Sequence, residues 1–125
     1  MTAQETEQTL TWIFASAFSL AVDVNIFRGF LPDHAINALG VIVDGFANGN
    51  YPGNCQEVSF QLLGRYESRQ EAMELCREID NFLPRYSTEI RLTKTGSGAV
   101  YESAAKGKKI WELSFNGKAV FLRKD

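Results

Sequence analysis

The sequence is poor in the residues that build metal sites and disulfide frameworks. Its 125 residues include two cysteines, Cys55 and Cys76, and a single histidine, His34. Two cysteines are too few for a disulfide framework, and one histidine leaves a zinc site short of its usual ligands. We therefore expect reduced thiols that serve as small hydrophobic side chains, with no bound metal and no other cofactor.

Long apolar runs are also missing. The apolar segment 12–22 has 11 residues, whereas a membrane-crossing helix needs roughly 20. Glu5 and Glu7 precede it, where a secretory signal would carry basic residues. We expect no membrane partner. The length suits one domain spanning 1–125, and 45% hydrophobic with 22% charged residues is an ordinary globular composition.

Recognisable catalytic motifs do not occur. A phosphate loop needs several glycines and a lysine, but the strand-to-helix join 64–67 reads Gly-Arg-Tyr-Glu and is interpreted as scaffolding. His34 beside Asp33 is the one pair that a general-base mechanism could use, and no serine or cysteine nucleophile stands in a recognisable motif. We expect no catalytic residues, and an enzyme that uses His34 and Asp33 stays an alternative.

Hydrophobic periodicity predicts the elements of the first half. Apolar residues recur at a helical spacing over 3–22, after a capping box formed by Thr2 and Glu5. Strand-forming residues and Gly/Pro/Asn punctuation predict the elements that follow. These are strands at 24–32, 38–45 and 57–64, with a loop at 46–54.

The second half contains one more helix and further strands. The helix begins at Ser68, which forms a capping box with Glu71, and Pro84 ends it. Asn116-Gly117 is the dipeptide most typical of a tight hairpin, and Trp111 is expected to be buried because it alternates with other apolar residues. The predicted strands are 89–95, 99–103, 110–115 and 118–124, with an exposed loop at 105–109.

The resulting order is α-β-β-β-α-β-β-β when the short return strand at 99–103 is not counted. Two amphipathic helices and strands joined by short turns favour a mostly antiparallel sheet. The sequence therefore predicts an α+β fold of two layers, with both helices packed on one face of the sheet.

Charge is divided unevenly along the chain. Residues 1–63 carry a net charge of −5, and residues 91–125 carry +5. The basic region holds Lys94, Lys106, Lys108 and Lys109 close to Trp111, and basic residues beside aromatics can follow a nucleic acid backbone. The aromatic signature of a four-stranded RNA recognition motif is missing, however. We expect no nucleic acid partner, and a small binding or adaptor module, binding nucleic acid through this region, stays the alternative function.

The middle of the chain resembles a known family. The segments "FRGFLPDHAINALGVIVDG", "NGNYPGN" and "QEVSFQLLGRYESRQEAMELCREIDNFL" are similar to the small minor capsid, or tail-terminator, proteins of tailed bacteriophages and prophages. The similarity is one of element order and of punctuating residues over 26–83, and Asn116-Gly117 with the residues after it departs from the family pattern. The punctuating residues are Leu31, Pro32, Gly49, Pro52, Gly64, Tyr66, Ala72 and Ile79.

The resemblance implies a structural role without chemistry. Such proteins form a ring, typically of six copies, on the end of the tail tube, where they stop tube polymerisation and dock the head-tail connector. The implied partners are other copies, the tube protein and the connector. The implied location is the virion tail or neck, and the bacterial host cytoplasm during assembly.

The uneven charge suggests how copies of such a ring would meet. A ring has heterologous contacts, and opposite charges favour head-to-tail docking. We expect the segment holding Lys94, Lys106, Lys108 and Lys109 to meet an acidic surface formed by residues 1–63 of the next copy.

Overall fold

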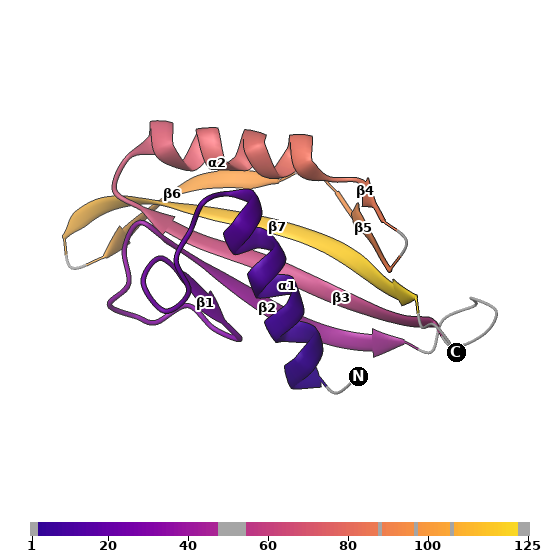
Figure 1. Cartoon of the computed structure of the whole chain (residues 1–125). Helices are drawn as coiled ribbons and strands as arrows, with labels where there is room; N and C mark the ends of the chain where they lie inside the picture. Colours follow the sequence, from indigo (N-terminus) through magenta and orange to yellow (C-terminus); the bar gives the residue numbers. More distant parts are fainter. Residues whose placement is uncertain (1–2, 48–54, 88, 97, 106, 123–125) are drawn as a thin grey trace.

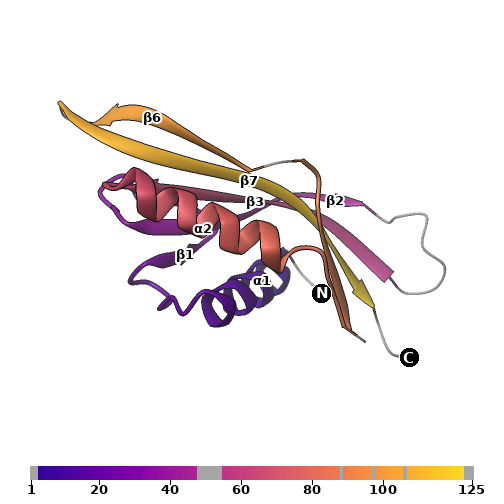
Figure 2. The same cartoon turned by 90° about the horizontal axis from the view of Figure 1, so that it is seen from above.

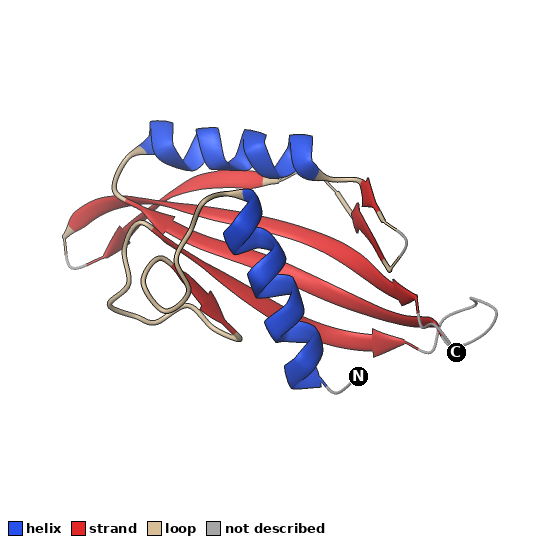
Figure 3. Ribbon diagram, in the orientation of Figure 1, coloured by secondary structure: helices blue, strands red, loops and turns tan. Residues whose placement is uncertain are grey.

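The computed structural model describes residues 3–47, 55–87, 89–96, 98–105 and 107–122. Over these residues two helices pack on one face of a seven-stranded open sheet, and the α+β prediction is confirmed (Figures 1 and 3). The elements are α1 (Ala3–Ala17), β1 (Ile26–Arg28), β2 (Ala38–Ala47), β3 (Cys55–Tyr66), α2 (Arg69–Phe82), β4 (Arg85–Tyr86), β5 (Ile90–Lys94), β6 (Ala99–Ala105) and β7 (Lys108–Leu122).

The long strand β7 organises the sheet. On one side it pairs with β3 from Trp111 to Leu122, and on the other side it pairs with β5 and β6, which lie end to end (Figure 2). The strand order is β1-β2-β3-β7-β5-β4, with β6 also on β7. Every pair is antiparallel except β1 with β2, so the mostly antiparallel sheet was predicted correctly.

The first helix and the first strand are both shorter than predicted. The helix ends at Ala17, and Ser19 follows it with a positive φ of 56°. The chain then reverses, with the backbone N–H of Ala21 donating to Asn25 Oδ1 at 2.7 Å. Gly29 ends the strand with φ +86°, and its N–H donates to the Val41 carbonyl at 2.7 Å. A left-handed conformation stops both elements, and the apolar pattern does not reveal it.

The second helix agrees closely with its prediction. Ser68 caps it, with the Ser68 hydroxyl oxygen accepting from the Glu71 N–H at 3.3 Å. Its apolar face is fully or almost fully buried at Ala72, Leu75 and Ile79. The two-residue strand β4, directly after Pro84, was not predicted.

The predicted hairpin at Asn116-Gly117 is wrong, because β7 passes straight through both residues. Gly117 lies opposite Phe60 of β3 and Lys94 of β5. A Cβ atom at this position would lie 2.4 Å from Phe60 Cζ and 2.6 Å from the Thr93 carbonyl oxygen. Glycine is therefore required because the Phe60 ring and the Thr93 carbonyl approach the β7 backbone closely, and no turn is involved.

The two predicted loops are also shorter than expected. Gly107, with φ +77°, lies between the end of β6 and the start of β7, so Lys108 and Lys109 belong to a strand. Of the loop predicted at 46–54, residues 46–47 belong to β2 and residues 48–54 lie outside the described residues.

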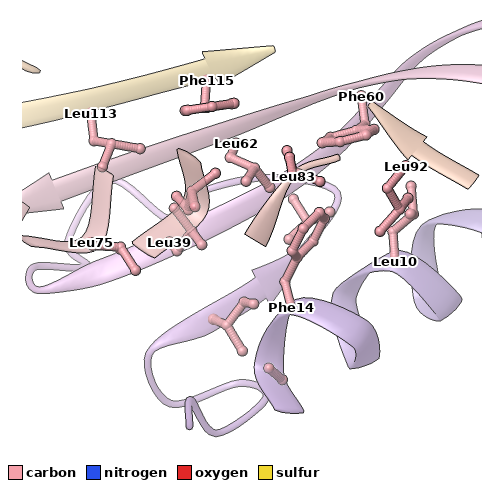
Figure 4. Packing of buried hydrophobic residues seen from close by; sticks show 14 of the residues in the cluster. Leu10, Phe14, Leu39, Phe60, Leu62, Leu75, Leu83, Leu92, Leu113 and Phe115 are labelled. Carbon is pink, nitrogen blue, oxygen red and sulfur yellow. The ribbon is translucent and has the colours of Figure 1, made fainter. Parts of the chain in front are cut away.

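The core lies between the two helices and the inner face of the sheet (Figure 4). At its centre Phe14 of α1 contacts three other aromatic rings, with centroid distances of 5.5 Å to Phe60, 6.0 Å to Phe82 and 6.0 Å to Phe18. Trp111, expected to be buried, is half-buried, and the Arg69 guanidinium lies 5.7 Å from its ring centroid. The helices are held against the sheet mainly by this aromatic and aliphatic contact.

Alkaline pH is expected to destabilise the fold through Tyr66. Burial, and secondly the Glu71 carboxylate, raise the pKa of this phenol above its ordinary value. The neutral phenol is favoured in the folded state, so its contribution is complete below pH ~10 and is lost as the pH rises further, by up to about 1.4 kcal/mol per pH unit. Denaturant unfolding between pH 8 and 11 should show this loss in the wild type and a smaller loss in Tyr66→Phe. An equal loss in both proteins would contradict the assignment, and Tyr86→Phe, at an exposed tyrosine, is the control.

Candidate functional site

The structure separates the lysines that the sequence grouped together. Lys94 ends β5 and lies opposite Gly117, whereas Lys109 lies near the start of β7, eight residues earlier and therefore roughly 26 Å away along the strand. Lys108 and Lys109 are neighbours. Lys106 lies outside the described residues. The lysines of the expected basic segment therefore lie in at least two separate regions of the surface.

Most of the described lysines already face a carboxylate of their own chain. Lys94 forms an ion pair with Asp80 of α2. Lys109 Nζ lies 3.5 Å from Glu102, and Lys118 Nζ lies 3.5 Å from Glu57. Such exposed pairs contribute little stability, but they neutralise the local charge. Lys108 is the described lysine for which no described carboxylate lies within ion-pair distance.

Lys108 borders a hollow of about 320 Å³ around His34. The hollow lies where the loop before β2 approaches the start of β7. Basic and acidic side chains share its rim, and three apolar residues complete the described lining, in which no serine, threonine or cysteine occurs. The lining residues are Asp33, His34, Ala35, Ile36, Arg65, Glu67, Lys108, Lys109 and Ile110.

Arg65 builds the wall of this hollow. Its Nη1 donates to the carbonyl oxygens of Pro32 at 2.9 Å, Asp33 at 3.2 Å and Ala35 at 2.9 Å. Nearby, the Glu67 N–H donates to Asn37 Oδ1 at 3.1 Å. These bonds attach the loop that carries His34 to the end of β3. Arg65 is therefore a positioning residue, in keeping with the prediction that the join at 64–67 is scaffolding.

Replacing Arg65 by methionine is expected to loosen this loop. Methionine keeps much of the side-chain volume but leaves three carbonyl oxygens without their charged donor, and hydrogen bonds to charged groups contribute about 1.5–3 kcal/mol. We expect Arg65→Met to lower the free energy of unfolding by about 2 kcal/mol and to raise amide hydrogen exchange at residues 33–37. Arg77→Met, on the exposed face of α2, is the matched control. Equal stability of the two variants would contradict this role.

A second concave surface lies between α1 and the segment that leaves α2. It measures about 570 Å³ and is mainly apolar. Trp12 is 63% exposed on its α1 side, and the Arg85 guanidinium lies 4.9 Å from the Phe82 ring centroid on the other side. The groove was not predicted from the sequence, although Trp12 falls outside the apolar stripe of its helix. The lining residues are Thr9, Trp12, Ile13, Ser16, Ala17, Phe82 and Arg85.

The punctuating residues on which the expected tail-terminator resemblance depends have structural roles wherever they are described. A Cβ atom at Gly64 would lie 2.6 Å from Tyr66 Cε2, and one at Gly40 would lie 3.1 Å from Leu31 Cβ. Ala72 and Ile79 are fully buried. Pro32 supplies a carbonyl oxygen to Arg65. Gly49 and Pro52 lie outside the described residues.

The fold thus defines a small α+β protein with an open, mostly antiparallel sheet and concave surfaces of mixed chemistry. The chain matches no known protein family, and no curated protein is significantly similar to it. In the described ranges, no three histidine, cysteine or acidic side chains are grouped so that they could hold a metal ion. Neither described helix is long and apolar enough to cross a membrane.

Proposed function

We propose that this protein is a structural assembly protein that caps the tail tube of a bacteriophage, ends tube polymerisation and joins the tail to the head connector as a ring of copies. The supporting observation is the element order over 26–83. A turn follows Leu31-Pro32, β3 ends at Tyr66, and Ala72 and Ile79 of α2 are buried. This is the order that the resemblance implies, except that β1 already ends at Arg28.

The geometry narrows the part of the basic region that would contact the next copy. Lys94 and Lys109 are already paired within the chain, whereas Lys108 is exposed beside the His34 hollow. We place the head-to-tail contact at Lys108, with Lys109 beside it. Exposed acidic residues in the first part of the chain, Asp23 and Asp44, offer charges of opposite sign on the neighbouring copy.

The test combines the protein with the tail-tube subunit encoded beside its own gene. Electron microscopy should show shorter tubes with the protein bound at one end, and native mass spectrometry should show closed oligomers. Because opposite charges favour the contact, Lys108→Glu with Lys109→Glu should reduce oligomers and the salt dependence of their formation. Lys118→Glu, whose lysine pairs with Glu57, is the control. Unchanged tube lengths and no capping would overturn the proposal.

A further inference from the structure

One lateral edge of the sheet ends in a strand of only three residues, β1. β1 pairs with β2 at Leu39, Gly40 and Val41. At the next edge position the Glu7 carboxylate of α1 accepts a hydrogen bond from the Val43 N–H at 3.2 Å. The edge groups of β2 are therefore occupied up to this point by another strand and then by a side chain. Such covering is a common way to prevent pairing with another molecule.

The edge formed by β6 is open. β6 pairs with β7 from Ala99 to Ala105, and no other described strand pairs with it. Figure 2 shows β6 along the margin of the molecule, while α2 lies over the inner face of the sheet. A strand paired on one side only directs every second backbone N–H and C=O outward. Seven residues is long for an edge strand whose outward backbone groups have no described strand partner.

We propose that β6 pairs antiparallel with β6 of a second copy, so that the two sheets continue into each other across a two-fold axis. The open groups are backbone donors and acceptors, so their occupant is an extended strand. A head-to-tail continuation would pair β6 with another outermost strand of the described sheet, and these are β1 with three residues and β4 with two, too short to occupy a seven-residue edge. The edge of an antiparallel strand is complementary to the same edge of a second copy after a two-fold rotation. The strand that pairs with β6 is therefore β6 of the second copy.

Of the registers centred on Tyr101 and on Glu102, the side chains favour the one on Tyr101. Pairing centred on Glu102 would place two carboxylates directly opposite each other, which is destabilising. Pairing centred on Tyr101 instead places two tyrosines opposite each other, and Val100 opposite Glu102. Tyr101 is 47% exposed, and aromatic cross-strand pairs are stabilising. The two-fold axis therefore passes between the two copies of Tyr101.

This contact does not rest on the proposed function, although the end of β6 pairs with Lys108 and Lys109, and Glu102 of β6 forms an ion pair with Lys109. A seven-residue edge buries little area, and small interfaces are weak. Sedimentation of the full chain should therefore show a dimer whose fraction rises with protein concentration. Tyr101→Lys, which places like charges on the axis, should remove the dimer, whereas Tyr101→Phe should retain it. A monomer at every concentration up to about millimolar, far above the range of a specific interface of standard size, would overturn the proposal.

A disulfide test fixes the register. In a Cys55→Ser, Cys76→Ala background, Tyr101→Cys should form a covalent dimer on oxidation because the two thiols face each other. Ser103→Cys should not, because residue 103 faces residue 99 of the second copy. Equal cross-linking of the Tyr101→Cys and Ser103→Cys variants would overturn the proposed β6 pairing. A dimer that persists in Tyr101→Lys would overturn it as well. Oligomers larger than a dimer that disappear in Lys108→Glu but persist in Tyr101→Lys would be evidence for the proposed ring. They would not bear on the β6 contact.

Discussion

Substitution of Gly117 by alanine is expected to lower the free energy of unfolding by about 3 kcal/mol, at the upper end of the usual cost of overpacking a core. The added methyl group would meet Phe60 Cζ at 2.4 Å and the Thr93 carbonyl oxygen at 2.6 Å. The ring could move, but the carbonyl belongs to the neighbouring strand β5. Urea unfolding at neutral pH gives the change from the transition midpoint.

The neighbouring residue supplies the control for this prediction. Asn116 is exposed in the middle of β7, so Asn116→Ala should change stability by less than about 0.5 kcal/mol. In a hairpin, both residues of the dipeptide would matter. A neutral Gly117→Ala, or an Asn116→Ala that is equally destabilising, would contradict the continuous strand. Adding Phe60→Leu to Gly117→Ala should give a total cost below the sum of the single variants, because the two side chains compete for one space.

Removal of the Phe14 ring is expected to be the most destabilising single truncation in α1. Phe14 is fully buried and contacts Phe18, Phe60 and Phe82. Phe14→Ala would lose the transfer free energy of the ring and leave a cavity between helix and sheet, at a cost of about 4 kcal/mol. Thermal and urea unfolding measure this cost, and binding of a hydrophobic dye would report a loosened core.

Trp12 provides the comparison within the same helix. Its side chain is 63% exposed beside the α1 groove, so Trp12→Ala should cost well under 1 kcal/mol. If Phe14→Ala and Trp12→Ala lowered the free energy of unfolding by similar amounts, α1 would have to pack on the sheet through a different face from the one described.

The elements that the sequence predicted well are those fixed by local interactions. Ser68 caps its helix through a residue three positions away, and the apolar face of α2 repeats at the helical period. In β3, Val58, Phe60 and Leu62 alternate with half-buried polar residues, which is the pattern of a strand with one face in the core. Neighbours in sequence decide both elements.

The elements that were predicted wrongly depend on residues far away in the chain. Gly117 is a glycine because of Phe60 and Thr93, and the Asn-Gly signal carries no information about them. β1 was predicted too long because Gly29 and its bond to Val41 are not visible in the apolar pattern. Parallel pairing of β1 with β2 likewise depends on a crossover loop attached by Arg65.

The candidate site was only partly accessible from the sequence. Lys108 and Lys109 are adjacent in both sequence and space, but Lys94 of β5 lies opposite Gly117, far from them along β7. The partners of the lysines, such as Glu102 for Lys109 and Asp80 for Lys94, come from other elements. The hollow at His34 requires Arg65 to bind three carbonyl groups of a distant loop, which no spacing rule predicts.

The position of β7 in the chain has a consequence for biosynthesis. The strand that joins β3 to both β5 and β6 is the last of the described elements to leave the ribosome. Until it emerges, the earlier strands form the groups β1-β2-β3 and β4-β5, with β6 paired to neither of them, and chain closure must wait for contacts between distant residues. A nascent chain of this protein would depend on protection from aggregation until residue 122 has left the ribosome.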